Sequence, residues 1–306
     1  MSIVQDLRTA FGRRDNALIQ LLLLNGVVYV VLVVLNAILG ISQAYGVQLL
    51  VARQLELSSD LGVLLRHPWT LFTYAITHRE FFHILFNLLN LYWFGQIIRE
   101  YLGDRRLVSL YVLGGLAGAA FFLLSYNLIP KLVDGPGANV IGASGAVTAI
   151  IVAAATLLPD YTFMLILLGP VKIKWIAAVL VLISLAGVNG GNAGGEITHL
   201  GGALLGFVFV KQLQAGRDLG APVQAIGNWF GKLFSRRPTM QASRSDAYRR
   251  PAPVSATSTT AGRAAAPAAA SHSQEEVDLI LDKISRSGYE SLSKEEKQKL
   301  FRASQE

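Results

Sequence analysis

Residues 17–40 read ALIQLLLLNGVVYVVLVVLNAILG, an apolar run without a charged side chain. The hydrocarbon core of a bilayer is about 30 Å thick, and a helix of about 20 apolar residues crosses it. Three basic residues, Arg8, Arg13 and Arg14, precede the run as they would in a signal peptide. The run is too long for the apolar part of a signal peptide, and it lacks a convincing small-residue cleavage site. It therefore predicts a retained transmembrane helix.

Five more apolar runs follow before residue 214. The composition agrees with a membrane protein, since 52% of the residues are hydrophobic and only 15% are charged. We expect an all-α fold, a polytopic bundle of six transmembrane helices over residues 17–213. The predicted spans are 17–40, 80–101, 107–126, 142–158, 173–189 and 195–213.

Clusters of basic residues set the predicted orientation of these spans, because cytoplasmic loops are enriched in Lys and Arg. With six crossings all four clusters fall on one side. Both termini are then expected in the cytoplasm, and the protein in the cell (inner) membrane. The net charge of +7 reflects this topology, and no nucleic-acid partner is expected. The clusters are Arg8 to Arg14, Arg99 with Arg105 and Arg106, Lys172 with Lys174, and Lys211 with Arg217.

The segments outside the spans divide into three. Residues 1–16 are expected to be a cytoplasmic N-terminus, 214–272 a flexible linker, and 273–306 a small helical-hairpin tail. Within the linker, residues 238–271 are rich in Ala, Ser, Thr and Pro. Such a composition cannot bury enough apolar surface to offset the entropy of ordering.

One part of the linker allows two interpretations. Trp229, Phe230, Leu233 and Phe234 stand beside Lys232 and further basic residues. They form either a short amphipathic segment on the membrane surface or part of the flexible tail, and the sequence favours neither. Membrane lipid is an expected partner of the protein in either case.

The C-terminal tail predicts two short helices. Ser273 with Glu276, and Ser293 with Glu296, have the spacing of a capping box, in which two side chains cap each other's backbone N–H groups. We expect this small unit to be marginal by itself and to dock on an unknown partner. The first helix would carry an apolar stripe of Val277, Ile280, Leu281 and Ile284.

Polar side chains within the spans indicate where chemistry occurs, because they are costly in a bilayer and usually face a cavity. His83 and Asn87 lie one turn apart near the outer end of the second span. Ser144 opens the fourth span and His199 lies in the first turns of the sixth, so all four are expected at one depth. Serine and histidine at matching depth are the minimum for nucleophilic catalysis, since the imidazole accepts and then returns the hydroxyl proton.

A tetrahedral intermediate also needs hydrogen-bond donors aimed at its oxyanion. The predicted donors are the side chains of His83 and Asn87 and the backbone N–H groups at the start of the fourth span, at Gly142 and Ala143. Glu196 is the only near candidate for an orienting carboxylate, and a Ser-His dyad is favoured over a triad that includes it. The chain has no cysteine, so a thiol nucleophile is not available.

Simpler roles are open for the same side chains. A serine in a transmembrane helix most often bonds a carbonyl of its own helix. His83 and Asn87 could satisfy each other or a neighbouring carbonyl, and His78 is expected to be an interfacial loop residue. A bundle packed through glycines would bring the spans close together in any case. The expected packing glycines are Gly145, Gly202 and Gly206.

Three motifs together resemble the rhomboid family of intramembrane serine proteases, in its bacterial form with a six-helix core and a cytoplasmic C-terminal tail. They occur in order, on the expected helices, and the similarity covers about residues 15–213. The motifs are His83-x-x-x-Asn87, Gly142-x-Ser144-Gly145 and His199-Leu200-Gly201-Gly202.

The resemblance implies roles for these residues. Ser144 would be the nucleophile, His199 the general base and acid, and His83 and Asn87 the residues on the oxyanion side. Rhomboids take transmembrane protein substrates and cut them near the outer surface, without a metal or cofactor. Two features depart from the family pattern. Thr148 occupies a position that is often aromatic and stacks on the catalytic histidine, and no Trp-Arg pair occurs in the first outer loop.

Two other functions compete with an active protease. A catalytically silent relative that binds membrane clients would usually have lost the serine or the histidine, and both are present. A channel or transporter is the less favoured reading, because it would place polar groups in both halves of the membrane. The titratable groups within the predicted spans cluster toward the outer side instead.

Overall fold

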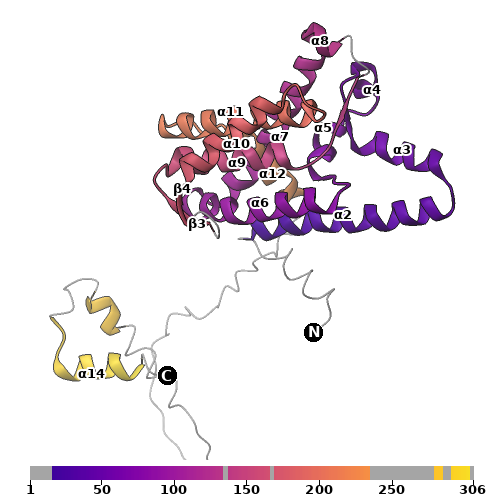
Figure 1. Ribbon diagram of the computed structural model, residues 1–306. Helices are drawn as coiled ribbons and strands as arrows, with labels where there is room; N and C mark the ends of the chain where they lie inside the picture. The colour runs from indigo at the N-terminus through magenta and orange to yellow at the C-terminus, as the bar shows by residue number, and fades with distance from the viewer. Residues whose placement is uncertain (1–15, 134–136, 166–168, 235–278, 285–290, 304–306) are drawn as a thin grey trace, which may run out of the picture. The chain divides into compact units, whose positions relative to one another are not determined.

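The computed structural model of the protein describes residues 16–133, 137–165, 169–234, 279–284 and 291–303 (Figure 1). The chain divides into two compact units, residues 1–238 and 239–306. The first unit holds all of the long apolar helices and is mostly helical, as the sequence predicts.

A helix lies at each of the six predicted apolar runs. By length and composition α2, α6, α7 and α11 qualify as membrane spans, whereas α9 and α10 are shorter apolar helices. Four of the described helices therefore meet the length expected of a span. The bounds are α2 Ala17–Ile41, α6 Phe81–Leu102, α7 Asp104–Leu128, α9 Ser144–Leu157, α10 Ile173–Gly187 and α11 Ala193–Gln214.

The short helix α9 lies in the core of the bundle, packed against α6, α7 and α11. Ala149, Ile150 and Ala154 of this helix are completely buried. With 14 residues α9 is about 21 Å long, less than the roughly 30 Å of a bilayer core. A helix of this length does not reach both surfaces of a bilayer core. This is tolerated where the adjoining loop is packed in protein or lines a wet cavity.

Helices α9 and α11 approach so closely that their backbones touch. A methyl group on Gly202 would overlap the carbonyl oxygen of Gly145, and one on Gly206 would overlap the carbonyl oxygen of Ala149. Small residues at a helix contact are what allow two backbones to come this near. These contacts agree with the packing role predicted for Gly145, Gly202 and Gly206, and they fix α11 against the start of α9.

Two small antiparallel sheets join the helices, a feature absent from the predicted all-α fold. β1 pairs with β2, with Leu57 opposite Val140 and Ser58 opposite Asn139, which ties the first interhelical segment to the residues just before α9. β3 and β4 form a hairpin between α9 and α10. The remaining elements of this part are α3 Tyr45–Leu55, β1 Leu57–Ser58, α4 Leu61–Arg66, α5 Thr70–Thr73, the 3-10 helix η1 Tyr74–Ile76, α8 Pro130–Val133, β2 Asn139–Val140, β3 Thr162–Leu165 and β4 Gly169–Lys172.

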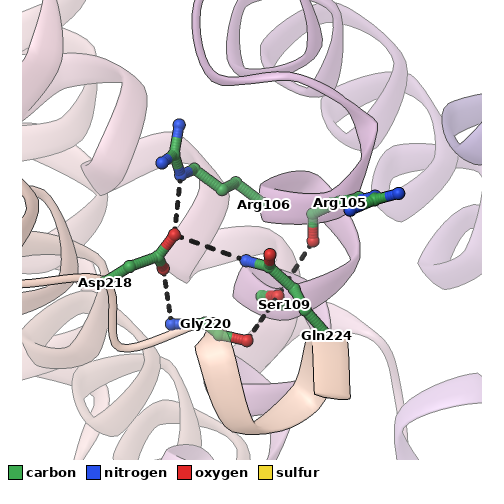
Figure 2. Close-up of polar contacts among 6 residues, drawn as sticks. All are labelled: Arg105, Arg106, Ser109, Asp218, Gly220 and Gln224. Atoms are coloured by element: carbon green, nitrogen blue, oxygen red, sulfur yellow. Dashed lines mark hydrogen bonds and ion pairs between the residues drawn. The ribbon is translucent and has the colours of Figure 1, made fainter. Parts of the chain in front are cut away.

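The beginning of the predicted linker is a helix. α12, Ala221–Phe234, follows α11 after a short turn and packs against the start of α7. Figure 2 shows the polar contacts that hold it there, centred on Asp218 and Ser109. The prediction of a flexible linker over 214–272 is therefore wrong for 221–234. Of the two interpretations of residues 229–234, the ordered segment is the one found, because they belong to α12. The contact of Asp218 with Arg106 that holds this helix could not be seen in the local sequence. Residues 235–272 and the N-terminal segment 1–15 lie outside the described residues.

The second unit contains a helix over residues 279–284 and α14, Lys294–Ala303. The capping box at the start of α14 is confirmed, because Ser293 Oγ accepts from the N–H of Glu296 and Glu296 Oε2 accepts from the N–H of Ser293. Lys283 forms an ion pair with Glu296 and links the two helices. Ile280 of the predicted stripe is buried. Leu281 is about half exposed, at 49%, so this member of the predicted stripe is not covered. Ser273, Glu276 and Val277 lie outside the described residues.

Candidate active site

A cavity of about 400 Å³ brings together the four polar residues singled out in the spans. Ser144 from α9, His199 from α11, and His83 and Asn87 from α6 all line it. Residues of α10 complete the wall, among them Ser184. The convergence expected from counting membrane crossings is thus present as a shared cavity.

The loop before α9 packs Gly142 against the ring of His83, close to the hydroxyl group of Ser144. Gly142 has a φ of 120°, a conformation that favours glycine, and its N–H donates to the carbonyl of Tyr74 at 2.9 Å. A methyl group on Gly142 would lie 2.6 Å from His83 Cε1 and 3.6 Å from Ser144 Oγ. The imidazole of His83 and the hydroxyl of Ser144 are therefore both close to Gly142, and any side chain there would collide with the His83 ring.

His199 is held through one of its two ring nitrogens. Nδ1 lies 3.1 Å from Ser184 Oγ and 3.2 Å from Glu196 Oε2. A carboxylate can only accept, so the contact with Glu196 favours the tautomer with hydrogen on Nδ1. This tautomer leaves Nε2 unprotonated and able to accept a proton. Among the described residues there is no hydrogen bond between Ser144 Oγ and His199, and such bonds are often long in resting enzymes.

The carboxylate of Glu196 fits into a space that a glycine leaves free. It lies one turn before His199 on α11, and its side chain is 18% exposed. A methyl group on Gly187, at the end of α10, would come within 2.8 Å of Glu196 Cγ. From the sequence, Glu196 is the only near candidate for an orienting carboxylate, and a dyad without it is favoured. The structure places it in contact with the histidine.

Ser184 is a site residue that the sequence interpretation missed. Its side chain is buried, and it is the only hydroxyl-bearing residue of α10. The available signal was a hydroxyl side chain within the otherwise apolar stretch 175–187, because polar residues inside a span usually face a bundle interior or a cavity.

Asn87 is one of the predicted oxyanion donors, and one of its two amide hydrogens is already used. One amide N–H of Asn87 donates to the carbonyl of His83 at 2.8 Å, as the simpler reading of this residue anticipated. Asparagine has two amide hydrogens, so the second can serve a ligand in the cavity. Residues with this geometry can bind a developing negative charge.

The backbone donors predicted at Gly142 and Ala143 require a correction. The N–H of Gly142 is bonded to Tyr74, and the N–H of Ala143 donates to His78 Nε2 at 3.2 Å. Both groups are occupied, because the preceding segment folds back onto the start of α9. The first N–H groups of a helix have no partner within it, so the N–H of Ser144 itself is the nearest backbone candidate.

His78 is also corrected, from an interfacial loop residue to a buried one. Its side chain is only 1% exposed and its ring packs edge-on against His83, with centroids 5.1 Å apart. Burial, together with the neighbouring His83, lowers the pKa of His78 to about 4. The neutral imidazole that results can accept the hydrogen bond from Ala143 and so fixes the start of α9.

Comparison with known proteins agrees with this geometry. Residues 65–214 match the family model of the rhomboid domain, a segment that contains every cavity residue discussed above. This part of the chain belongs to the rhomboid family. Together with its apolar helices, the rhomboid domain makes the chain a multi-pass membrane protein.

Curated relatives carry rhomboid names. RHOMBOID-like protein 12, mitochondrial, of Arabidopsis thaliana is 32% identical over 48% of this chain and 47% of its own length. Rhomboid protein 1, mitochondrial, of Saccharomyces cerevisiae is 29% identical over 51% of this chain and 45% of its own. The chain therefore spans about half the length of the curated relatives it matches. Residues 269–306 match a separate family of unknown function, DUF6576.

One departure from the usual rhomboid pattern has a structural counterpart. Thr148, at the position that is often aromatic, donates its hydroxyl hydrogen to the carbonyl of Ser144 and lines the cavity. It offers no ring to stack on the imidazole. In this rhomboid domain His199 is instead held at Nδ1 by Ser184 and Glu196. Among the described residues no group of three His, Asp or Glu side chains is placed to hold a metal ion.

Proposed function

We propose that this protein is an intramembrane serine endopeptidase that hydrolyses peptide bonds in or next to the transmembrane segments of membrane proteins. The observation that carries the proposal is the shared cavity of Ser144 and His199, within a rhomboid domain. The hydrogen bond between the carboxylate of Glu196 and His199 Nδ1 supports the proposal, because it leaves Nε2 as the basic nitrogen of the ring.

The reaction follows from these contacts. Ser144 Oγ attacks the carbonyl carbon of the substrate while its proton passes to His199 Nε2. The oxyanion that forms is stabilised by the side chains of His83 and Asn87 and by the N–H of Ser144. His199 then gives the proton to the leaving amine, which breaks the peptide bond and leaves an acyl-enzyme. A water molecule, deprotonated by His199, releases the new carboxylate and regenerates the serine.

Water must reach this chemistry inside a membrane, and the composition of the cavity is suited to that. Glu80, Asn90 and Asn192 line it in addition to the residues named above. The shortness of α9 supports a site set below the surface, in a pocket open to one side. An apolar and enclosed cavity of the same size would exclude water.

We further propose the membrane arrangement on the same grounds. All six apolar helices would cross, with α9 and α10 short because the bundle and its loops cover their ends. The basic clusters would place both termini in the cytoplasm of a cell whose inner membrane holds the protein. Two curated relatives are named as mitochondrial proteins, and those names describe the relatives.

The test uses purified full-length protein and a membrane-protein substrate with one labelled transmembrane segment. We expect cleavage by the wild type, none by Ser144→Ala, and cleavage close to wild type by Ser109→Ala. Ser109 is a matched control because it is fully buried in α7 and donates to a carbonyl of its own helix, outside the cavity. Cleavage that survives Ser144→Ala contradicts the proposal. If wild type and Ser144→Ala bind the substrate with the same affinity and the wild type does not react with a serine-directed probe, the protein is the catalytically silent relative instead.

A further inference from the structure

Helix α12 presents an apolar face that no described residue covers. Ile226, Trp229 and Phe230 are 59%, 60% and 48% exposed. Their spacing of three and four residues puts them on one side of the helix. Exposed apolar side chains grouped in this way mark a binding surface rather than an ordinary solvent-facing helix.

The position of α12 in its unit is fixed by polar contacts with the first turns of α7. Arg106 Nε donates to Asp218 Oδ2 at 3.0 Å, and Ser109 Oγ lies 3.3 Å from the carbonyl oxygen of Gly220 (Figure 2). The N–H of Gly220 and the amide of Gln224 also donate to Asp218. Burial tends to raise the pKa of Asp218, but these donors hold it below its usual value, so the carboxylate stays charged.

These contacts set the depth of α12 relative to a bilayer. The span α7 begins at Asp104 and the span α11 ends at Gln214, only a few residues from the contacts with Asp218. The ends of spans lie at the boundary between hydrocarbon and headgroups. A helix bonded to that boundary with an apolar face is placed where interfacial helices lie, and Trp is enriched there.

The charge around α12 favours one kind of membrane surface. Residues 211–237 contain five basic residues and a single acidic one, Asp218, which is paired with Arg106. Basic residues beside a span are attracted to anionic headgroups, by about 1 kcal/mol for each Lys or Arg near the surface. A second copy of the chain is a weaker fit. Three exposed side chains fall well short of the roughly 800 Å² that each partner buries in a stable dimer.

We propose that α12 lies in the headgroup layer of the membrane and binds a bilayer that contains anionic lipid, with Ile226, Trp229 and Phe230 inserted among the acyl chains. The hydrogen bonds of Asp218 hold the helix against α7. This interaction is independent of peptide-bond hydrolysis, so it stands or falls separately from the proposed function.

The absence of cysteine from the chain makes a direct test possible. Full-length protein with Ile226→Cys or Asn228→Cys is labelled with an environment-sensitive fluorophore and reconstituted in vesicles. The two positions form a matched pair, since both are exposed and point to different sides of α12. We expect position 226 to gain several-fold in emission in vesicles with 30% phosphatidylglycerol and to be quenched by a lipid carrying a spin label, while position 228 changes little.

A charge variant completes the design. Lys232→Gln combined with Arg236→Gln and Arg237→Gln should lower the emission at position 226 to its level in neutral phosphatidylcholine vesicles. Equal, water-like emission at both positions in anionic vesicles would overturn the proposal. So would protection of position 226 without quenching by the lipid, because that result identifies a protein partner such as a second copy.

Discussion

Glu196 Oε2 lies 3.2 Å from His199 Nδ1, one turn earlier on the same helix. Ser184 Oγ contacts the same nitrogen at 3.1 Å. Side chains from α10 and α11 therefore both hold the imidazole at Nδ1. The other ring nitrogen, Nε2, is the one that a serine nucleophile needs as a base. An aromatic ring stacked on the histidine would achieve the same restraint, and Thr148 provides none.

The contact with Glu196 predicts a graded response to substitution. Glu196→Gln keeps an oxygen that can accept from Nδ1–H but loses the charge, whereas Glu196→Ala loses both. If the carboxylate orients His199, we expect kcat to fall by about 10-fold in Glu196→Ala and by less in Glu196→Gln, with KM nearly unchanged. Steady-state cleavage of the labelled substrate measures both. Equal, wild-type kcat values in the two variants would remove Glu196 from the mechanism.

Ser184 predicts an effect that depends on Glu196. Either residue can occupy Nδ1 when the other is absent, so Ser184→Ala alone should lower kcat only a few-fold. The double variant should lose more than the sum of the two single effects on the free-energy scale. A complete double-mutant cycle of cleavage rates measures this coupling. Strict additivity would show that the two side chains do not hold the same nitrogen.

His78 predicts a pH dependence of stability. Its pKa is about 4 in the folded protein and about 6.5 in an unfolded chain. Between these values the unfolded state binds the proton and the folded state does not. The contribution is therefore complete above pH 6.5 and is lost as the pH falls toward 4, by up to about 3 kcal/mol. Thermal unfolding in detergent should follow this slope, and His78→Gln should flatten it. An unchanged slope in His78→Gln would assign the pH dependence to other groups.

The close approach of α9 and α11 predicts a steric cost at one glycine. Gly202→Ala should lower the free energy of unfolding by about 1–3 kcal/mol, because the new methyl group meets the carbonyl oxygen of Gly145. It should also reduce cleavage, since the two helices carry Ser144 and His199, the proposed nucleophile and base. Gly227→Ala in α12 is the control, with nothing within 4 Å of the added methyl group. The packing account fails if the two variants unfold at the same temperature.

Much of this fold was predictable because its signals are local. A long apolar run such as 17–40 needs no tertiary information, and each of the six runs coincides with a helix. The expectation that Ser144 and His199 come together followed from counting crossings, and the two residues line one cavity. The capping box of Ser293 and Glu296 followed from a spacing of three residues.

The features that escaped prediction are contacts between distant segments. His78 is buried because its segment folds against Ala143, 65 residues later in the chain. The same packing occupies the backbone groups that sequence reasoning assigned to an oxyanion. The docking of α12 depends on Asp218 reaching Arg106, 112 residues away. Periodicity and composition describe one segment at a time, so pairings of this kind become visible only in the folded chain.

The most direct test of the central claim is labelling of the reconstituted protein with a fluorophosphonate probe, followed by mapping of the modified peptide by mass spectrometry. The account predicts one modified residue, Ser144, and loss of labelling in His199→Asn while thermal unfolding stays close to wild type. Labelling at another serine, or labelling of Ser144 that is equally fast without the imidazole of His199, would contradict it.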